Sequence, residues 1–185
     1  MTRNNLVFAV AAALGLALDQ LTKSWVRGNV NVLTDEIPII PKVLSIVHAQ
    51  NTGAAFSLMD GQMALFLVTT IVGVGLVLSF QWSLKEQPGA AFTSGVLGAI
   101  LGGILGNGVD RLLLGHVTDM VKCYWGFEPG RSWMIDTFGT NVYPIWNVAD
   151  ALLVVGIIVF LVGQAFQREE EPLIVEDEAS SGAGG

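Results

Sequence analysis

The sequence is poor in the residues that form disulfides and metal centres. It has one cysteine, Cys123, and two histidines, His48 and His116, among 185 residues. A single cysteine excludes an intrachain disulfide and a cysteine-cluster metal site. The histidines are far apart in the sequence, which argues against a histidine-based metal centre. We therefore expect neither a metal nor a cofactor.

Charged residues are also scarce. Only 14% of the residues are charged and 52% are hydrophobic, whereas soluble domains carry about 25% charged residues. The formal net charge is −7, but six acids lie between Glu169 and Glu178, and without them the charge is −1. This leaves no basic face for nucleic acid. The composition is that of a membrane protein.

Long apolar runs are what the sequence has in abundance. Four segments are long enough to cross a hydrocarbon core of about 30 Å: residues 5–26, 62–82, 90–114 and 147–166. We predict an all-α membrane protein with four transmembrane helices, in which residues 1–166 form one domain. The third segment contains five glycines at spacings that let helix backbones approach closely: Gly95, Gly98, Gly102, Gly103 and Gly106.

The segments between and after the predicted helices differ in character. Residues 28–61 combine two prolines with the alternations Val30/Val32 and Ile37/Ile39, which predicts short strands and turns outside the hydrocarbon. Residues 115–144 mix aromatic side chains with Lys122 and Arg131, so we predict a loop at the membrane interface or an amphipathic flap. Residues 167–185 are acidic and then glycine-rich, which is typical of a disordered tail.

Four crossings place both termini on one side of the membrane and both loops on the other. The positive-inside rule gives no support for cytoplasmic termini. Three basic residues fall on the side of the termini and six on the side of the loops. These are Arg3, Lys85 and Arg168 against Lys23, Arg27, Lys42, Arg111, Lys122 and Arg131.

Polar residues gather where the third helix ends and the fourth begins. Charged groups at membrane depth cost about 2.5–3.5 kcal/mol each on insertion scales, unless they are paired or serve a function. Asp119 follows the third helix and Asp150 lies at the start of the fourth. Two carboxylates held close together share one proton. We therefore predict that Asp119 and Asp150 meet as the two halves of an aspartyl hydrolase.

The residues alone leave other readings open for each part of this cluster. Asn147 and Asp150 could be only a helix-capping pair, and Asp110 with Arg111 could be a structural ion network. Asp19 and Lys23 share a helix face as a helix-end pair or as part of a cleft wall. Asn51 and Gly53 could be turn residues. Cys123 and His116 could be a cysteine-protease pair, although no nucleophile signature surrounds them.

Two other classes of function compete with the hydrolase. Intramembrane Asp, Asn and Arg also mark proton and ion paths, so a small proton-coupled transporter is the main alternative. The polar residues lie at one edge of the helices and not through the span, which argues against it. A structural scaffold of glycine-packed helices would not need two separated acids on one face.

Four motifs occur in order along the predicted helices. They are Asp19-Gln-Leu-Thr-Lys23, Asn51-Thr-Gly-Ala-Ala-Phe-Ser57, Gly106-Asn-Gly-Val-Asp-Arg111 with Gly115-His-Val-Thr-Asp119, and Pro144-Ile-Trp-Asn-Val-Ala-Asp150. Together they resemble the bacterial lipoprotein signal peptidases (signal peptidase II) over residues 5–166. The chain departs from that pattern in a longer span between Asp119 and Asn147, in Trp146 where Phe is usual, and in Met120-Val121.

The resemblance implies a function. Such enzymes are aspartyl endopeptidases of the bacterial inner membrane with cytoplasmic termini. They remove signal peptides from diacylglyceryl-modified prolipoproteins by cutting before the lipid-bearing cysteine. It further implies contact with membrane lipids, inhibition by cyclic peptide antibiotics and, as we expect here, a monomer. The family's catalytic pair matches Asp119 and Asp150, and its supporting or substrate-binding residues match Asp19, Asn51, Gly53, Asn107, Arg111 and Asn147.

Overall fold

The computed structural model describes residues 2–53, 63–84 and 89–169. Four helices are long and apolar enough to span a membrane: α1 (Arg3–Asn29), α2 (Met63–Ser83), α3 (Ala90–Leu114) and α5 (Val148–Glu169). A three-stranded antiparallel sheet has the order β1 (Glu36–Ile40), β2 (Leu44–Asn51), β3 (Val117–Cys123), and the short helix α4 (Gly130–Phe138) follows β3. The predicted fold class is confirmed.

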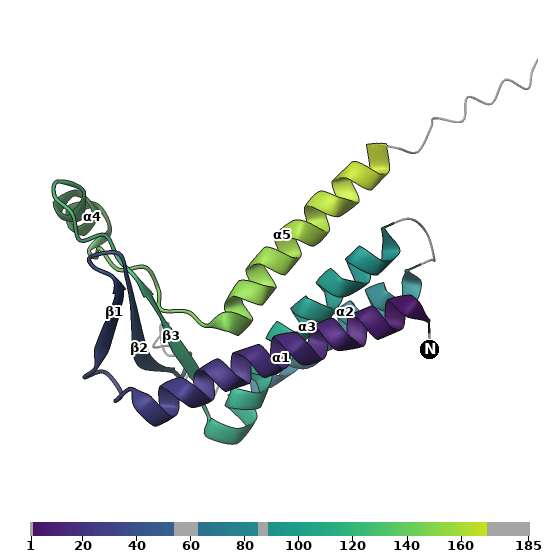
Figure 1. Cartoon of the computed structure of the whole chain (residues 1–185), viewed down its shortest axis with the longest axis horizontal. Helices are drawn as coiled ribbons and strands as arrows, with labels where there is room; N and C mark the ends of the chain where they lie inside the picture. The colour runs from purple at the N-terminus through teal and green to yellow at the C-terminus, as the bar shows by residue number, and fades with distance from the viewer. Residues whose placement is uncertain (1, 54–62, 85–88, 170–185) are drawn as a thin grey trace, which may run out of the picture.

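The helices and the sheet occupy opposite parts of the molecule (Figure 1). The N-terminal end of α1 and the C-terminal end of α5 lie at one end of the bundle, and the sheet lies at the other, with α4 at its far tip. Helix α3 is the most buried span and contacts α1, α2 and α5. Leu97 and Ile100 of α3 form the apolar core with Ala12 of α1 and Val77 of α2. Helices α2 and α5 turn most of their apolar side chains outward, as membrane spans do.

Glycines bring α1 and α3 together, as predicted. A Cβ atom on Gly102 would lie 2.8 Å from the carbonyl oxygen of Ala12 and 3.0 Å from the backbone nitrogen of Leu16. These are backbone atoms of α1, which cannot move aside as a flexible side chain can. The close approach of the two backbones therefore depends on the missing side chain.

The sheet and the segment after it differ from the prediction in one respect. Residues 115–144 were expected to form a loop, but they contain β3 and α4. Strand β3 pairs with β2, with Asp119 opposite Ala49 and Val121 opposite Ile46. This pairing joins segments about seventy residues apart, so the local pattern could not reveal it.

Several boundaries also shift. The Val30/Val32 alternation does not form a strand, because α1 continues to Asn29 and a turn follows in which Asp35 accepts a hydrogen bond from the Asn31 backbone (2.9 Å). Strands β1 and β2 confirm the rest of the predicted β-rich region within the described residues; positions 54–61 lie outside them. Helix α5 extends to Glu169, and the predicted tail lies outside the described residues from position 170 onward.

The helix packing gives a first prediction. Gly102→Ala places a methyl group against the α1 backbone, and we expect it to lower the free energy of unfolding by about 1–3 kcal/mol, as overpacking does. The matched control is Gly75→Ala on α2, where nothing lies within 4 Å of the added atom. Thermal unfolding in detergent micelles measures both. Equal melting temperatures for the two variants would contradict this account of the α1–α3 contact.

Candidate active site

The two predicted catalytic carboxylates lie on different elements at the sheet end of the bundle. Asp119 is in β3 and is almost fully buried, whereas Asp150 is in the first turn of α5 and is half-buried. The residue that leads into α5 is tied to the strand: the Val121 nitrogen donates to the Trp146 carbonyl (2.8 Å), and the Trp146 nitrogen donates back (3.1 Å). This two-way bond fixes the start of α5 against the strand that carries Asp119.

Asn147 connects the two carboxylates. Its side-chain amide donates to Asp119 Oδ1 (2.6 Å), and its backbone nitrogen donates to Asp150 Oδ2 (3.2 Å). Its side-chain oxygen accepts from the backbone nitrogen of Asp150 (3.0 Å). The last two bonds form a reciprocal cap at the start of α5. The predicted cap is therefore present, but Asn147 and Asp150 are not only a capping pair, because the same asparagine also binds Asp119.

Asn107 of α3 completes the polar contacts of Asp150. Its amide nitrogen donates to Asp150 Oδ1 (2.8 Å), while its oxygen accepts from Asn147 (3.1 Å) and from the Lys23 ammonium (2.8 Å). A lysine can only donate hydrogen bonds, so it fixes which end of the Asn107 amide faces it. The amide nitrogen is then directed at the carboxylate of Asp150.

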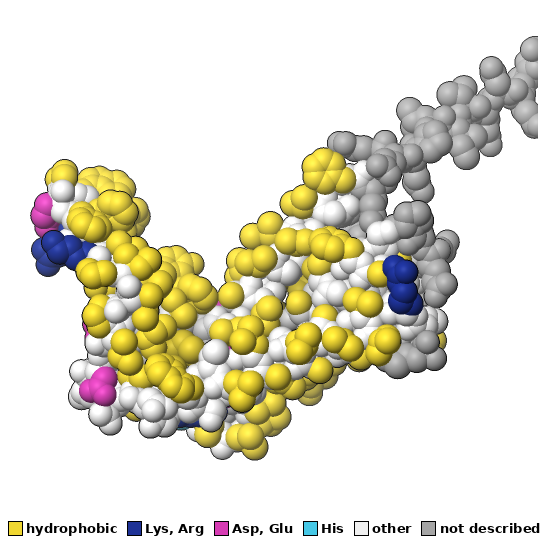
Figure 2. Space-filling view, in the orientation of Figure 1, with side chains coloured by type: hydrophobic (Ala, Val, Ile, Leu, Met, Phe, Trp, Pro, Cys, Tyr) yellow, Lys and Arg dark blue, Asp and Glu magenta, His cyan; other side chains and the backbone are white. Residues whose placement is uncertain are grey.

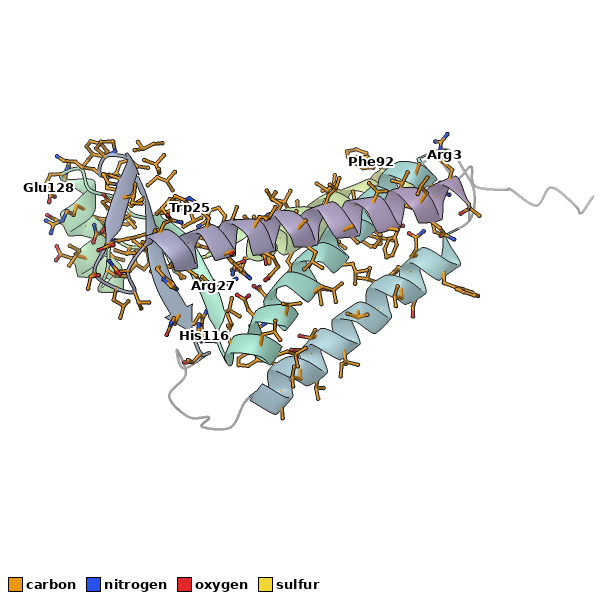
Figure 3. The ribbon with its side chains drawn as sticks, turned by 60° about the horizontal axis from the view of Figure 1, so that its bottom comes forward. Arg3, Trp25, Arg27, Phe92, His116 and Glu128 are labelled. Atoms are coloured by element: carbon orange, nitrogen blue, oxygen red, sulfur yellow. The ribbon has the colours of Figure 1, made fainter. Side chains whose placement is uncertain are left out.

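Lys23 is the centre of a buried ionic cluster next to the two aspartates. Its ammonium contacts Asp19 (2.9 Å) and Asp110 (3.2 Å) in addition to Asn107, which uses its three donors. Lys23, Asp19 and Asp110 are all at most 1% exposed. Arg27 lies on the side of α1 that faces β3 (Figure 3) and contacts Asp110 at 3.5 Å. Two acids and two bases make this cluster neutral.

The acids of the cluster hold the backbone next to each predicted catalytic residue. Asp19 accepts a hydrogen bond from the Ala149 nitrogen (2.9 Å), and Asp110 accepts one from the Thr118 nitrogen (2.9 Å). Ala149 immediately precedes Asp150, and Thr118 immediately precedes Asp119. Gly106 permits this arrangement, because a Cβ atom there would collide with the Asp19 carboxylate. Asp19 and Lys23 thus do form the predicted helix-end pair, but the pair is fully buried and supports the site through the backbone.

The surroundings of Asp119 favour its protonated form. Burial and, to a smaller extent, the charge of Asp150 raise its pKa, hydrogen bonds from Asn51 and Asn147 oppose the rise, and together they bring the pKa to about 6. The Asn51 amide donates to Asp119 Oδ2 at 3.0 Å. A carboxyl group with a pKa near 6 beside a second carboxylate can hold a proton close to neutral pH.

Asn51 and Gly53 form a turn at the end of β2. The Gly53 nitrogen donates to the Asn51 side-chain oxygen (2.9 Å), and Gly53 has a φ of +80°, which glycine adopts readily. The predicted turn is therefore present, but Asn51 is not only a turn residue, because its amide also donates to Asp119. The contact of Asn51 in this structure is with a carboxylate and not with a peptide backbone.

Arg111 does not form an ion pair with Asp110, its neighbour in the sequence. Asp110 does lie in a structural ion network, but its ion pairs are with Lys23 and Arg27 and not with Arg111. The two residues are adjacent on a helix and therefore point in different directions. The Arg111 guanidinium lies 4.6 Å from the centre of the Phe66 ring, and one of its nitrogens is 3.5 Å from the Asn107 carbonyl. Its charge is close enough to interact with those of Asp119 and Asp150.

The cysteine-protease alternative is wrong. His116 directly precedes β3 and Cys123 is its last residue. A strand rises about 3.3 Å per residue, so the two side chains are about 20 Å apart. Over residues 2–53, 63–84 and 89–169, no three His, Cys, Asp or Glu side chains are grouped to hold a metal ion.

Sequence reasoning missed several members of the cluster. Gln20 donates to Asp19, Asp110 and the Gly106 carbonyl, and Arg27 donates to the Thr118 hydroxyl. One signal was available: Asp19, Lys23 and Arg27 recur every four residues and so line one face of a mostly apolar helix. Charged residues repeated along one face of a membrane helix indicate a shared internal partner.

Comparisons with known proteins agree on one family. The model of the family described as "Signal peptidase (SPase) II" matches residues 11–166. The "Lipoprotein signal peptidase" of Shouchella clausii is 38% identical over 162 residues, 88% of this chain and 95% of the relative. That of Deinococcus radiodurans is 34% identical over 91% of this chain and 84% of the relative. A solved structure of a bacterial membrane enzyme has 26% identity and a TM-score of 0.68, covering 85% of this chain and 91% of that chain.

The buried cluster gives a second prediction. Lys23→Met leaves two buried carboxylates without their shared ammonium, and breaking such a buried pair costs about 3–5 kcal/mol of unfolding free energy. The control is Lys122→Met, which removes a partly exposed ion pair with Glu36 (2.7 Å) worth under about 1 kcal/mol. Thermal unfolding in detergent compares them. A Lys23 variant as stable as the Lys122 variant would show that the cluster does not hold the fold.

Proposed function

This chain belongs to the signal peptidase II family, and from that membership and the site geometry we propose that Asp119 and Asp150 are its catalytic pair. The observation that carries the assignment is Asn147, which hydrogen-bonds both carboxylates. The transporter alternative is not supported, since both the family and the relatives are peptidases. The described polar cluster also lies at one end of the helices.

The reaction needs one proton on the pair of aspartates. The ionised carboxylate removes a proton from a water molecule, while the protonated one hydrogen-bonds the carbonyl oxygen of the scissile peptide. The water oxygen bonds to the carbonyl carbon and gives a tetrahedral intermediate. The C–N bond then breaks as a proton passes to the leaving nitrogen, and the pair returns to one proton. We assign that proton to the pair and not to either residue.

The proposed substrate is a diacylglyceryl-modified prolipoprotein, cut just before its lipid-bearing cysteine. The aspartates lie where membrane-spanning helices meet the sheet, so a substrate anchored in lipid can reach them from the side. Cyclic peptide antibiotics are expected to bind at the same place. Both carboxylates come from one chain, which supports a monomer as the working unit.

We propose cytoplasmic termini in the bacterial inner membrane, with the sheet on the outer side. The excess of basic residues near the sheet argued against this orientation. Four of them are paired with carboxylates in the structure: Lys23 and Arg27 in the buried cluster, Lys122 with Glu36 and Arg131 with Glu128. Acidic partners contribute little to orientation, however, so the proposed orientation rests on the family and not on charge.

The third prediction tests the catalytic pair. Asp119→Asn and Asp150→Asn each keep the shape of the side chain but cannot share the proton, and we expect loss of prolipoprotein cleavage with membrane insertion unchanged. Purified variants in lipid bicelles with a synthetic lipopeptide substrate give the measurement. Asp35→Asn, at a partly exposed position just before β1, is the control that retains activity. Turnover in either dyad variant at the control's rate would remove the assignment.

The fourth prediction concerns pH. The Asn51 hydrogen bond lowers the pKa of Asp119, so Asn51→Ala should raise that pKa. A hydrogen bond to a charged group contributes about 1.5–3 kcal/mol. Since Asn51 is exposed, the lower end applies, which is about one pKa unit. The alkaline limb of the kcat/KM profile should therefore move up by about one pH unit. A limb that stays in place or moves down would contradict this role.

A further inference from the structure

A segment that the proposed reaction does not use projects from the end of β3. We call residues 123–143 the aromatic arm; it is a short ribbon that leads into α4 and back. The Trp125 nitrogen donates to the Asn141 carbonyl (2.9 Å), and the Tyr143 nitrogen donates to the Cys123 carbonyl (2.9 Å). The Gly126 nitrogen also donates to the Lys42 carbonyl between β1 and β2 (2.9 Å). The arm is therefore a built extension of the sheet.

The arm exposes large aromatic side chains. Trp133 is 61% exposed and Phe138 is 64% exposed, and all nine residues of α4 are at least partly exposed. The rings pack on each other and not on a core: Trp133 meets Phe138 edge-on at 5.7 Å, and Trp125 meets Phe127 at 5.8 Å. A helix with this many uncovered apolar side chains needs an apolar surface to cover it.

The position of the arm indicates what covers it. The sheet extends sideways from the bundle, and α4 at its tip lies across an open, V-shaped space from α5 (Figure 1). Hydrophobic side chains line both sides of that space (Figure 2). One side is formed by a membrane-spanning helix whose exposed face includes Val154, Ile158 and Leu161. A bilayer that α5 spans covers this face of the helix with lipid, and the space that the arm faces adjoins it.

Charge does not favour a charged partner for the arm. It contains only Glu128, Arg131 and Asp136, a net charge of −1, and Glu128 pairs with Arg131 at 3.3 Å. Attraction to anionic headgroups would need a basic face. Tryptophan, tyrosine and phenylalanine around a nearly neutral helix are typical of the boundary between headgroups and acyl chains.

We propose that the aromatic arm inserts Trp133 and Phe138 into the lipid leaflet on the sheet side of the membrane. It thereby holds the sheet flat against the bilayer and sets the depth of β3. The occupant of this surface is the bilayer itself and not the substrate. The insertion does not depend on the assignment of Asp119 and Asp150, although it would fix the level at which Asp119 meets a lipid-anchored peptide.

The test places a nitroxide label at single positions of the Cys123→Ser protein in phosphatidylcholine nanodiscs. Labels at Trp133→Cys and Phe138→Cys should be reached several-fold more readily by oxygen than by a water-soluble nickel chelate. Labels at Ser132→Cys, on another face of α4, and at Thr34→Cys, on an exposed turn, should show the reverse. Chelate access at 133 and 138 equal to that at 34 would overturn the proposal. Protection that appears only after lipopeptide substrate is added would overturn it as well, because the arm would then bind substrate.

A milder pair of substitutions covers the case in which the labelled proteins do not fold. The double variant Trp125→Phe/Trp133→Phe keeps both positions aromatic. The tryptophan emission that it loses, relative to the unchanged protein, is the emission of the arm. That component should be quenched by brominated phosphatidylcholine and not by aqueous iodide. The positive control is the emission lost in Trp82→Phe, because Trp82 lies at the end of the spanning helix α2 and should be quenched by the brominated lipid. Quenching of the arm component by iodide alone would refute insertion.

Discussion

The structure of the site depends on one buried ammonium group. Lys23 contacts Asp19 and Asp110, and each of these acids holds the backbone nitrogen of the residue that precedes a dyad aspartate. One cation therefore connects α1 to the start of α5 and, through the end of α3, to the start of β3. Because all three charged groups are buried, their mutual attraction is not weakened by water. A change in the position of Lys23 would move both carboxylates at once.

The same ammonium also determines how the asparagines are oriented. Lys23 accepts no hydrogen bonds, so the Asn107 oxygen faces it and the Asn107 nitrogen faces Asp150. Asn147 donates both to that oxygen and to Asp119. A cation that touches neither carboxylate thus directs donors at both of them, through two uncharged amides. Donors held in place before the substrate arrives need no reorganisation during the reaction.

The sequence predicted well what depends on local pattern. Helix α3 runs from Ala90 to Leu114 as predicted, since a glycine flanks each end and its apolar run is unbroken. Three asparagines that the motifs singled out, Asn51, Asn107 and Asn147, do hydrogen-bond Asp119 or Asp150. Strand β3 and helix α4 were missed: the partner of β3 is distant in the chain, and α4 is brief and has no core-facing side. The centre of the ionic cluster was missed for a related reason, because Lys23 finds Asn107 84 residues away.

The neutrality of the ionic cluster affects whether Asp119 and Asp150 can share a proton. A lone lysine near two carboxylates would favour ionisation of both, and the shared proton would be lost. Here Asp19 and Asp110 balance Lys23 and Arg27. Among the causes that shift the pKa of Asp119, the charge of Lys23 has a smaller effect than burial, the two asparagines or Asp150. The cluster can hold β3 and α5 rigidly without removing the proton that the pair needs. Structural support and proton sharing are compatible in this site because the charges that provide the support cancel.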